Sequence, residues 1–346
     1  MKCKLCLKNE ADKTGSHLVP HFLLKRIENI EGKKGRDYEI GFLLGDLDSK
    51  FHFGRSVPPE KLKELLGDLS DEEISNNKHP FIIDNIFCSD CEKRFSVIEN
   101  IYANTLKKVE NIEYESGVSF HIGMLFWISI IWRISTQKIL GFSLNETNQE
   151  LLRQILDSFL PKSIKEINDK KFATSKITEN ISYKLLRCSN CETERNKWLF
   201  IFPNLENVIC IVIDEFLLVL SLNGNYDEIY NNDCYGMNNY ILNAPVNTNS
   251  GNEIILPFDK TSYKSLIERI IKELNENFFN ELNQYLDDIY KQITGRRNET
   301  MPLNIKQEII KEIITGQSKI GRKYTLREIV RIIIKKLIKH NIIKII

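Results

Sequence analysis

The chain has 346 residues, of which 42% are hydrophobic and 27% are charged, and its formal net charge is +1. This composition is typical of a folded protein, excludes a disordered or fibrous chain, and with this length predicts about two domains. The balanced charge also excludes a surface that attracts polyanions everywhere, although residues 317–346 hold nine Lys or Arg and one acidic residue, which predicts a local basic patch.

The chain begins with a cysteine pair whose spacing is typical of metal ligands. Cys3 and Cys6 form one C-x-x-C pair, Cys88 and Cys91 form another, and two such turns complete a tetrahedral four-thiolate site. We therefore predict that these four residues bind a structural Zn²⁺ ion. No apolar leader segment is found in the opening residues MKCKLC, so we expect thiolates in a reducing cytoplasm rather than a disulfide framework.

Short strands and Gly-containing turns are predicted between the two cysteine pairs, followed by a helix from about Glu92. His17 lies early in this segment, between Ser16 and a short apolar run. A neutral imidazole can accept a proton from a water molecule, so His17 could act as a general base. The alternative interpretation is a histidine that is hydrogen-bonded to a backbone carbonyl or serves as an additional zinc ligand.

An apolar helix over about 119–140 is predicted next. Its most apolar run, 118–132, is shorter than a membrane span and is followed directly by Arg133. We therefore expect a buried helix whose arginine pairs with a carboxylate, and no membrane-spanning segment. Capping-box spacings predict later helix starts at Thr147, Ser265 and Thr325, and Gly316 is predicted to end the helix before the last one.

Residues 180–222 contain strand-like runs rich in β-branched and aromatic residues, and one further strand, EIILPF, follows later. The chain is thus predicted to be an α+β protein. Its N-terminal zinc domain covers residues 1–110, and a larger, mostly helical domain with a small antiparallel sheet covers 111–346. A third pair, Cys188 and Cys191, lacks a partner pair at knuckle spacing, so a second metal site completed by Cys210 and Cys234 stays open.

The segments CKLC, SHLVP and FCSDCE together resemble the HNH endonuclease family over about residues 1–105. The resemblance implies a treble-clef zinc domain with the ββα-metal fold. It also implies hydrolysis of DNA phosphodiester bonds with one divalent ion, Mg²⁺ or Mn²⁺, at the scissile phosphate. The biological context that it suggests is restriction of foreign DNA or phage defence, and RNA stays open as a substrate.

Carried over residue by residue, the resemblance makes His17 the catalytic base and the four cysteines the zinc ligands. Glu92 stands where the family has a metal-binding histidine, and its carboxylate is an acceptable ligand for Mg²⁺. Ser16 stands where the family has a metal-binding aspartate, and a hydroxyl is a poor substitute. Asn85 is the nearest match to the family's loop asparagine. Glu99 shares a predicted helix face with Glu92, which indicates either a second carboxylate ligand or a partner for a cation.

The last predicted helix carries a basic stripe, which we define by residues four positions apart: Arg327, Arg331, Lys335 and Lys339. Such a stripe could bind phosphates with a steep dependence on salt, or it could simply be the solvated face of a core helix. The main alternative to an endonuclease is therefore a zinc-stabilised module that binds nucleic acid or protein and cuts nothing. A homo-oligomer or protein partner, contacted through 111–346, also stays open.

Overall fold

A six-stranded sheet forms the centre of the computed structural model, which describes all residues except 30–32, 34–37, 45–48, 168, 189–196, 204, 250, 321–323, 325 and 344–346. The strand order is β5-β10-β6-β9-β8-β7, and every pair is antiparallel except β10 with β6. The predicted small antiparallel sheet is therefore larger and mixed. Its strands are β5 (Tyr114–Ser119), β6 (Ser182–Arg187), β7 (Trp198–Ile201), β8 (Val208–Asp214), β9 (Phe216–Ser221) and β10 (Asn252–Pro257).

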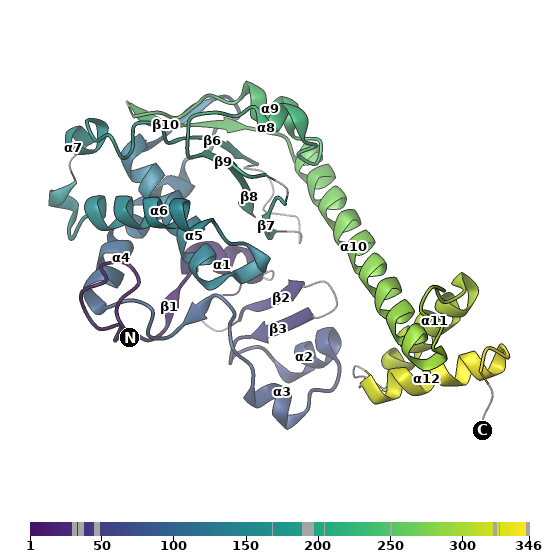
Figure 1. Cartoon of the computed structure of the whole chain (residues 1–346). Helices are drawn as coiled ribbons and strands as arrows, with labels where there is room; N and C mark the ends of the chain where they lie inside the picture. The colour runs from purple at the N-terminus through teal and green to yellow at the C-terminus, as the bar shows by residue number, and fades with distance from the viewer. Residues whose placement is uncertain are drawn as a thin grey trace.

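Helices cover both faces of this sheet (Figure 1), as the unbroken apolar runs of β8 and β9 require. Alternate residues of β9 face opposite sides: Leu218 packs with α5 (Phe120–Gln137) and α6 (Glu146–Phe159), whereas Leu217 packs with α9 (Asn238–Asn243) and the start of α10 (Lys260–Thr294). The smaller helices around the sheet are η1 (Asn104–Lys107), η2 (Ile139–Gly141), η3 (Ile164–Glu166), α7 (Asp169–Ala173) and α8 (Glu228–Asn231).

The apolar helix is α5, which is buried along nearly its whole length. None of the helices that the structure describes combines the length and the apolar character needed to cross a bilayer. Beside α5, the side chain of Glu253 on β10 is fully buried and accepts hydrogen bonds from Tyr102, Trp127 and Tyr183. Because these donors come from three different elements, this carboxylate fixes β10 in its internal position.

The N-terminal elements pack against α5, and helix α1 (His21–Glu28) also contacts β8 of the sheet. β1 (Ser16–His17) pairs antiparallel with β4 (Ile82–Ile83), and α4 (Ser89–Ala103) follows directly. Side chains from this part, α5 and the sheet form one continuous hydrophobic core, so the predicted boundary at 110/111 crosses a shared core. The segment between β1 and β4 holds α1 (His21–Glu28), the hairpin β2 (Ile40–Leu44) and β3 (Ser49–Phe53), α2 (Pro59–Leu66) and α3 (Asp71–Ser75).

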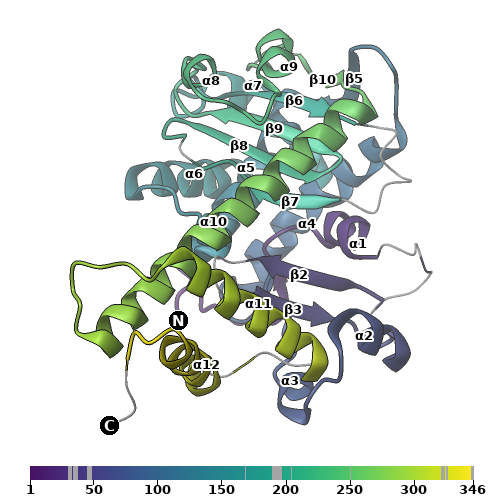
Figure 2. The ribbon, with the colours of Figure 1, turned by 90° about the vertical axis from the view of Figure 1, so that its right-hand side faces the viewer.

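A separate small core lies at the far end of α10. Figures 1 and 2 show this long helix leading away from the sheet to α11 (Leu303–Ile320) and α12 (Leu326–Lys339). The C-terminal part of α10 packs with those two helices through Leu286, Ile309 and Leu337. The middle of α10 exposes Phe278 and Phe279. Helices α11 and α12 therefore pack at the C-terminal end of α10.

Several predicted helix ends are wrong by a few residues. α6 begins before Thr147 because the side chain of Asn145 accepts a hydrogen bond from the Asn148 amide. α10 begins before Ser265 because Asp259 caps the amide of Ser262. α11 continues through Gly316, where a Cβ atom would collide with the Tyr324 ring, so this glycine permits close packing instead of ending the helix. Thr325 lies outside the described residues.

Candidate functional site

The four predicted zinc ligands come together at the start of α4. The ligand sulfurs of Cys3, Cys6, Cys88 and Cys91 all lie within 4.8 Å of one another, and the Sγ atoms of Cys6 and Cys88 are 3.9 Å apart. A four-thiolate set of this kind fits a structural Zn²⁺ ion, which binds sulfur at about 2.3 Å. The structure thus confirms a cluster that could hold a metal ion and is compatible with structural zinc.

Local hydrogen bonds explain how residues so distant in sequence form this cluster. The Leu7 amide donates to the Cys3 carbonyl and the Glu92 amide to the Cys88 carbonyl, so each cysteine pair sits in a tight turn. Between the pairs, the Lys4 amide donates to Ile86, and the Asn9 side chain approaches the Cys88 sulfur at 3.6 Å. The contact between Cys3 and Cys91 lowers the pKa of the Cys3 thiol and raises that of Cys91, so without a metal ion the cluster favours a thiolate at Cys3 alone.

The two predicted catalytic residues lie on either side of β1. Ser16 is fully buried, and its hydroxyl donates to Glu92 Oε2 at 3.1 Å. Successive side chains of a strand face opposite ways, so His17 is directed to the other side, where its ring centroid lies 5.4 Å from that of His21. Among the described residues, neither His17 nor Glu92 belongs to a compact group of three metal-ligating side chains. Burial raises the pKa of Glu92.

Four of the six histidines of the chain gather around this side of β1. We call His17, His21, His52 and His79 the histidine cluster. The ring centroids of His52 and His79 lie 4.0 Å apart, and the charge of His79 acts on His17. His52 comes from β3, while His79 comes from the loop before β4. The segment inserted between β1 and β4 therefore supplies side chains next to the predicted base.

The buried carboxylate of Glu28 lies between two members of the histidine cluster, His52 and His79. Glu28 Oε1 is 3.0 Å from His52 Nε2, and Glu28 Oε2 is 3.1 Å from His79 Nε2. These contacts outweigh the effect of burial and lower the pKa of Glu28 to about 2. The three residues form a second group whose ligand atoms lie within 4.8 Å of one another. Sequence reasoning missed this group because its members are far apart along the chain.

His17 is placed where it stays neutral well below physiological pH. Burial, together with the positive charges of His21, His79 and Arg133, lowers its pKa to about 4. In the unfolded chain the histidine pKa is about 6.5, so at pH values between about 4 and 6.5 the unfolded state binds more protons than the folded state. The free energy of unfolding should therefore decrease as the pH is lowered from about 6.5 to 4. Substituting His17→Gln should remove this contribution. NMR titration of His17 and urea unfolding across this range test the prediction; a His17 pKa near 6.5 would contradict it.

Arg133 fastens β1 and α4 to α5. Its Nη2 lies 2.8 Å from Glu99 Oε1, and its Nη1 donates to the His17 carbonyl at 2.8 Å. The expected carboxylate partner of this buried arginine is thus Glu99, which favours the ion-pair interpretation of Glu99 over a metal ligand. Arg133 also holds the backbone of the predicted base in place.

Substituting Arg133→Met should reduce the free energy of unfolding by about 3 kcal/mol, because Glu99 and the His17 carbonyl then lose a buried charged partner. Urea unfolding measures this loss. The double variant Arg133→Met, Glu99→Met is the control, and it should recover part of the loss because no unpaired carboxylate remains. A single variant as stable as the wild type would show that the pair contributes nothing.

Three other residues, two of them named in the sequence analysis, have more ordinary positions. Asn85 is an exposed turn residue with a φ of 59°, a conformation that asparagine tolerates well. Arg26 on α1 pairs with the buried carboxylates of Asp214 and Glu215, so its charge is neutralised by the sheet. Cys188 is disulfide-bonded, which argues against a second thiolate metal site there; Cys191 lies outside the described residues.

The basic stripe is exposed, but part of it is neutralised. Lys335 lies 3.7 Å from Glu312, and Lys339 lies 2.9 Å from Glu308, both on α11. Arg327 and Arg331 are exposed on the same face of α12. Arg327 and Arg331 are therefore the most accessible charges of the stripe. Their exposure fits both a phosphate-binding surface and a solvated helix face.

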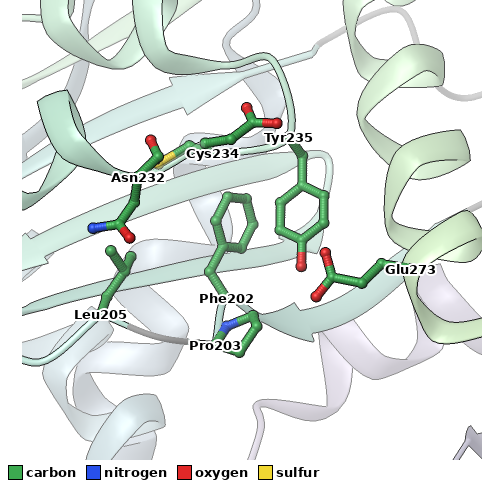
Figure 3. Close-up of a pocket in the computed structure, with 8 residues that line it drawn as sticks. Phe202, Pro203, Leu205, Asn232, Cys234, Tyr235 and Glu273 are labelled. Carbon is green, nitrogen blue, oxygen red and sulfur yellow. The ribbon is translucent and has the colours of Figure 1, made fainter. Parts of the chain in front are cut away.

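A small pocket of about 160 Å³ opens between the loops after β7 and α8 and the middle of α10 (Figure 3). Glu273 faces the Tyr235 hydroxyl there, and burial together with this contact raises the pKa of Tyr235. The volume is below the range of about 300–1,000 Å³ that is typical of small-molecule sites. We therefore assign no ligand to it. Its lining residues are Phe202, Pro203, Leu205, Asn232, Asp233, Cys234, Tyr235 and Glu273.

Comparison of the chain with protein-family models, curated proteins and solved structures gives no match. The resemblance to HNH endonucleases thus rests on the three short segments alone.

Proposed function

We propose that this chain is a metal-dependent, HNH-like endonuclease in which His17 activates the water molecule that attacks a DNA phosphodiester bond. The observation that best supports the proposal is the antiparallel pair β1 and β4 followed by α4. The cysteine cluster fixes the start of α4 to the N-terminus of the chain. This order of elements is the one that a ββα-metal nuclease on a treble clef would have.

His17 has the chemical properties that the proposed role requires. Its low pKa leaves the imidazole neutral at pH 7, so it can accept a proton from water. Arg133 donates to its backbone carbonyl, which restricts the position of the backbone that carries the ring. A divalent ion at the phosphate would stabilise the charge that develops during attack. Glu92 stays a predicted oxygen ligand for Mg²⁺ or Mn²⁺, although its carboxylate now accepts a hydrogen bond from Ser16.

The second candidate is a zinc-stabilised module that binds nucleic acid without cutting it. The exposed arginines of the basic stripe favour it, and so does Ser16 in place of a metal-binding aspartate. Binding through such a stripe would weaken steeply as salt concentration rises.

One experiment separates these functions. Zinc-loaded protein is incubated with supercoiled plasmid, linear DNA and RNA at two salt concentrations, with Mg²⁺, Mn²⁺ or a chelator. Nicking or cutting that needs the added divalent ion supports the endonuclease, and the preferred substrate shows whether DNA or RNA is cut. Salt-sensitive binding without cleavage supports the binding module. A protein that shows no cleavage and no binding of any of these nucleic acids would contradict both proposals and favour a protein-interaction role.

A further inference from the structure

Glu28, His52 and His79 form a group that the proposed function does not use. They come from the end of α1, from β3 and from the loop before β4, so the fold brings together three residues that no local motif connects. Glu28 and His52 are 6% and 4% exposed. Such deep burial is costly for a carboxylate and an imidazole unless their polar atoms are bound.

The hydrogen bonds within the group do not satisfy the ring nitrogens of His52. Both ring nitrogens of His52 are buried and make no hydrogen bond within the described part of the chain. Its Nε2 nevertheless lies 3.0 Å from Glu28 Oε1, so the two atoms are close but their orientation is wrong for a hydrogen bond. Zn–N and Zn–O bonds of about 2.0–2.2 Å separate tetrahedral ligands by about 3.3 Å. The spacing of these atoms is therefore close to that of two ligands of one ion.

Two features of the surroundings also favour a cation. Glu28 is the last residue of α1, where the helix dipole is negative and a carboxylate is unfavourable without a nearby positive charge. On the facing strand, the His52 ring packs directly over Gly41: a Cβ atom there would lie 2.5 Å from His52 Nε2 and 3.1 Å from Glu28 Oε1. A glycine at this position therefore keeps the His52 nitrogen beside the Glu28 carboxylate, where both can contact one ion.

We propose that Glu28, His52 and His79 bind one divalent transition-metal ion of the Zn²⁺ class. Two imidazole nitrogens and one carboxylate oxygen suit such ions better than Mg²⁺ or Ca²⁺, which prefer oxygen ligands alone. Three protein ligands leave a coordination position for water, as in catalytic zinc sites. A role of this ion in phosphodiester hydrolysis beside His17 rests on the proposed function, whereas binding of the ion does not.

Binding of the ion should change the protonation of His79. In the structure the Phe81 amide donates to His79 Nδ1 at 3.2 Å, so the neutral ring carries its proton on Nε2 and donates it to Glu28 Oε2. A metal ion on Nε2 requires the proton on Nδ1 instead, and the hydrogen bond from Phe81 is then lost. This exchange gives a signal specific to His79 in the ¹⁵N spectrum of the histidine rings.

The test measures how many metal ions the full chain binds. Purified protein is dialysed against Co²⁺, a spectroscopic substitute for Zn²⁺, and its metal content is determined. We expect two equivalents: one with the intense charge-transfer absorption of thiolate ligands, from the cysteine cluster, and one without it. His52→Gln and Glu28→Gln should each bind one equivalent fewer and keep the thiolate absorption, which also shows that the N-terminal part is still folded.

The matched control is His340→Gln, which changes a histidine on the far end of the molecule and should keep both equivalents. Addition of Zn²⁺ to the wild-type protein should also move the His79 proton from Nε2 to Nδ1. A wild-type protein that binds only the thiolate equivalent at saturating Co²⁺ would overturn the site, and so would an unchanged second equivalent in both variants. Two equivalents with no cleavage of any nucleic acid would refute the proposed function and leave the metal site intact.

Discussion

Cys88→Ser should release the zinc ion and destabilise the chain by more than about 5 kcal/mol, the largest effect that we expect from any single substitution. Structural zinc contributes about 10–16 kcal/mol to the folding of small zinc domains. Here the cluster joins the N-terminus to the start of α4, and the same core continues into α5. Loss of the ion should therefore lower the melting temperature of the whole chain, measured by circular dichroism together with zinc content.

Cys234→Ala is the matched control for this substitution. Cys234 is also a free, buried cysteine, but it lies outside the cysteine cluster. Its replacement removes one sulfur atom from a core and should cost about 1 kcal/mol without changing the zinc content. If Cys88→Ser kept its zinc and melted like the control, the four sulfurs would not be a structural metal site.

His17→Ala should reduce divalent-dependent cleavage by about 10²–10⁴-fold, the usual contribution of a positioned general base. Zinc content and melting temperature should change little, because the ring of His17 is only partly buried and the backbone bond from Arg133 to the His17 carbonyl does not need the side chain. Cleavage rates are compared at saturating DNA, so that a weaker affinity for DNA is not mistaken for slower chemistry.

His340→Ala serves as the control in the same assay. Its ring contacts only Glu308 among the interactions recorded for the described residues, far along the chain from β1, and its cleavage rate should equal that of the wild type. Full cleavage by His17→Ala would refute the assignment of the base. Restored cleavage after addition of imidazole to His17→Ala would distinguish a lost base from a displaced backbone.

The sequence predicts features that depend on neighbouring residues and misses features that depend on contacts between distant segments. The two C-x-x-C pairs indicate zinc ligands because two such turns together complete a four-thiolate site, and the four sulfurs do meet. The sequence predicts that Arg133 pairs with a carboxylate but does not identify Glu99, because Glu99 reaches Arg133 only when α4 packs on α5. The mixed sheet could not be predicted for the same reason, because the pairing of β10 with β6 is set by tertiary contacts between distant segments.

Glu28, His52 and His79 could not be found from spacing. Glu28 lies on α1, His52 on β3 and His79 in the loop before β4, and two of the connecting loops contain residues outside the described part of the chain. One signal was available: four of the six histidines fall within the first 79 residues. Histidines concentrated beside a predicted metal domain indicate shared chemistry, but only the fold shows which of them meet.

The internal position of β10 has a consequence for synthesis on the ribosome. Its neighbours β5 and β6 are made much earlier, so until residue 257 has emerged the nascent chain must keep two unpaired strand edges and the apolar surface of α5 apart from other chains. Such edges are sites of aggregation. From the strand order we therefore expect the nascent chain to depend on chaperones during translation, and fragments that stop before β10 to aggregate.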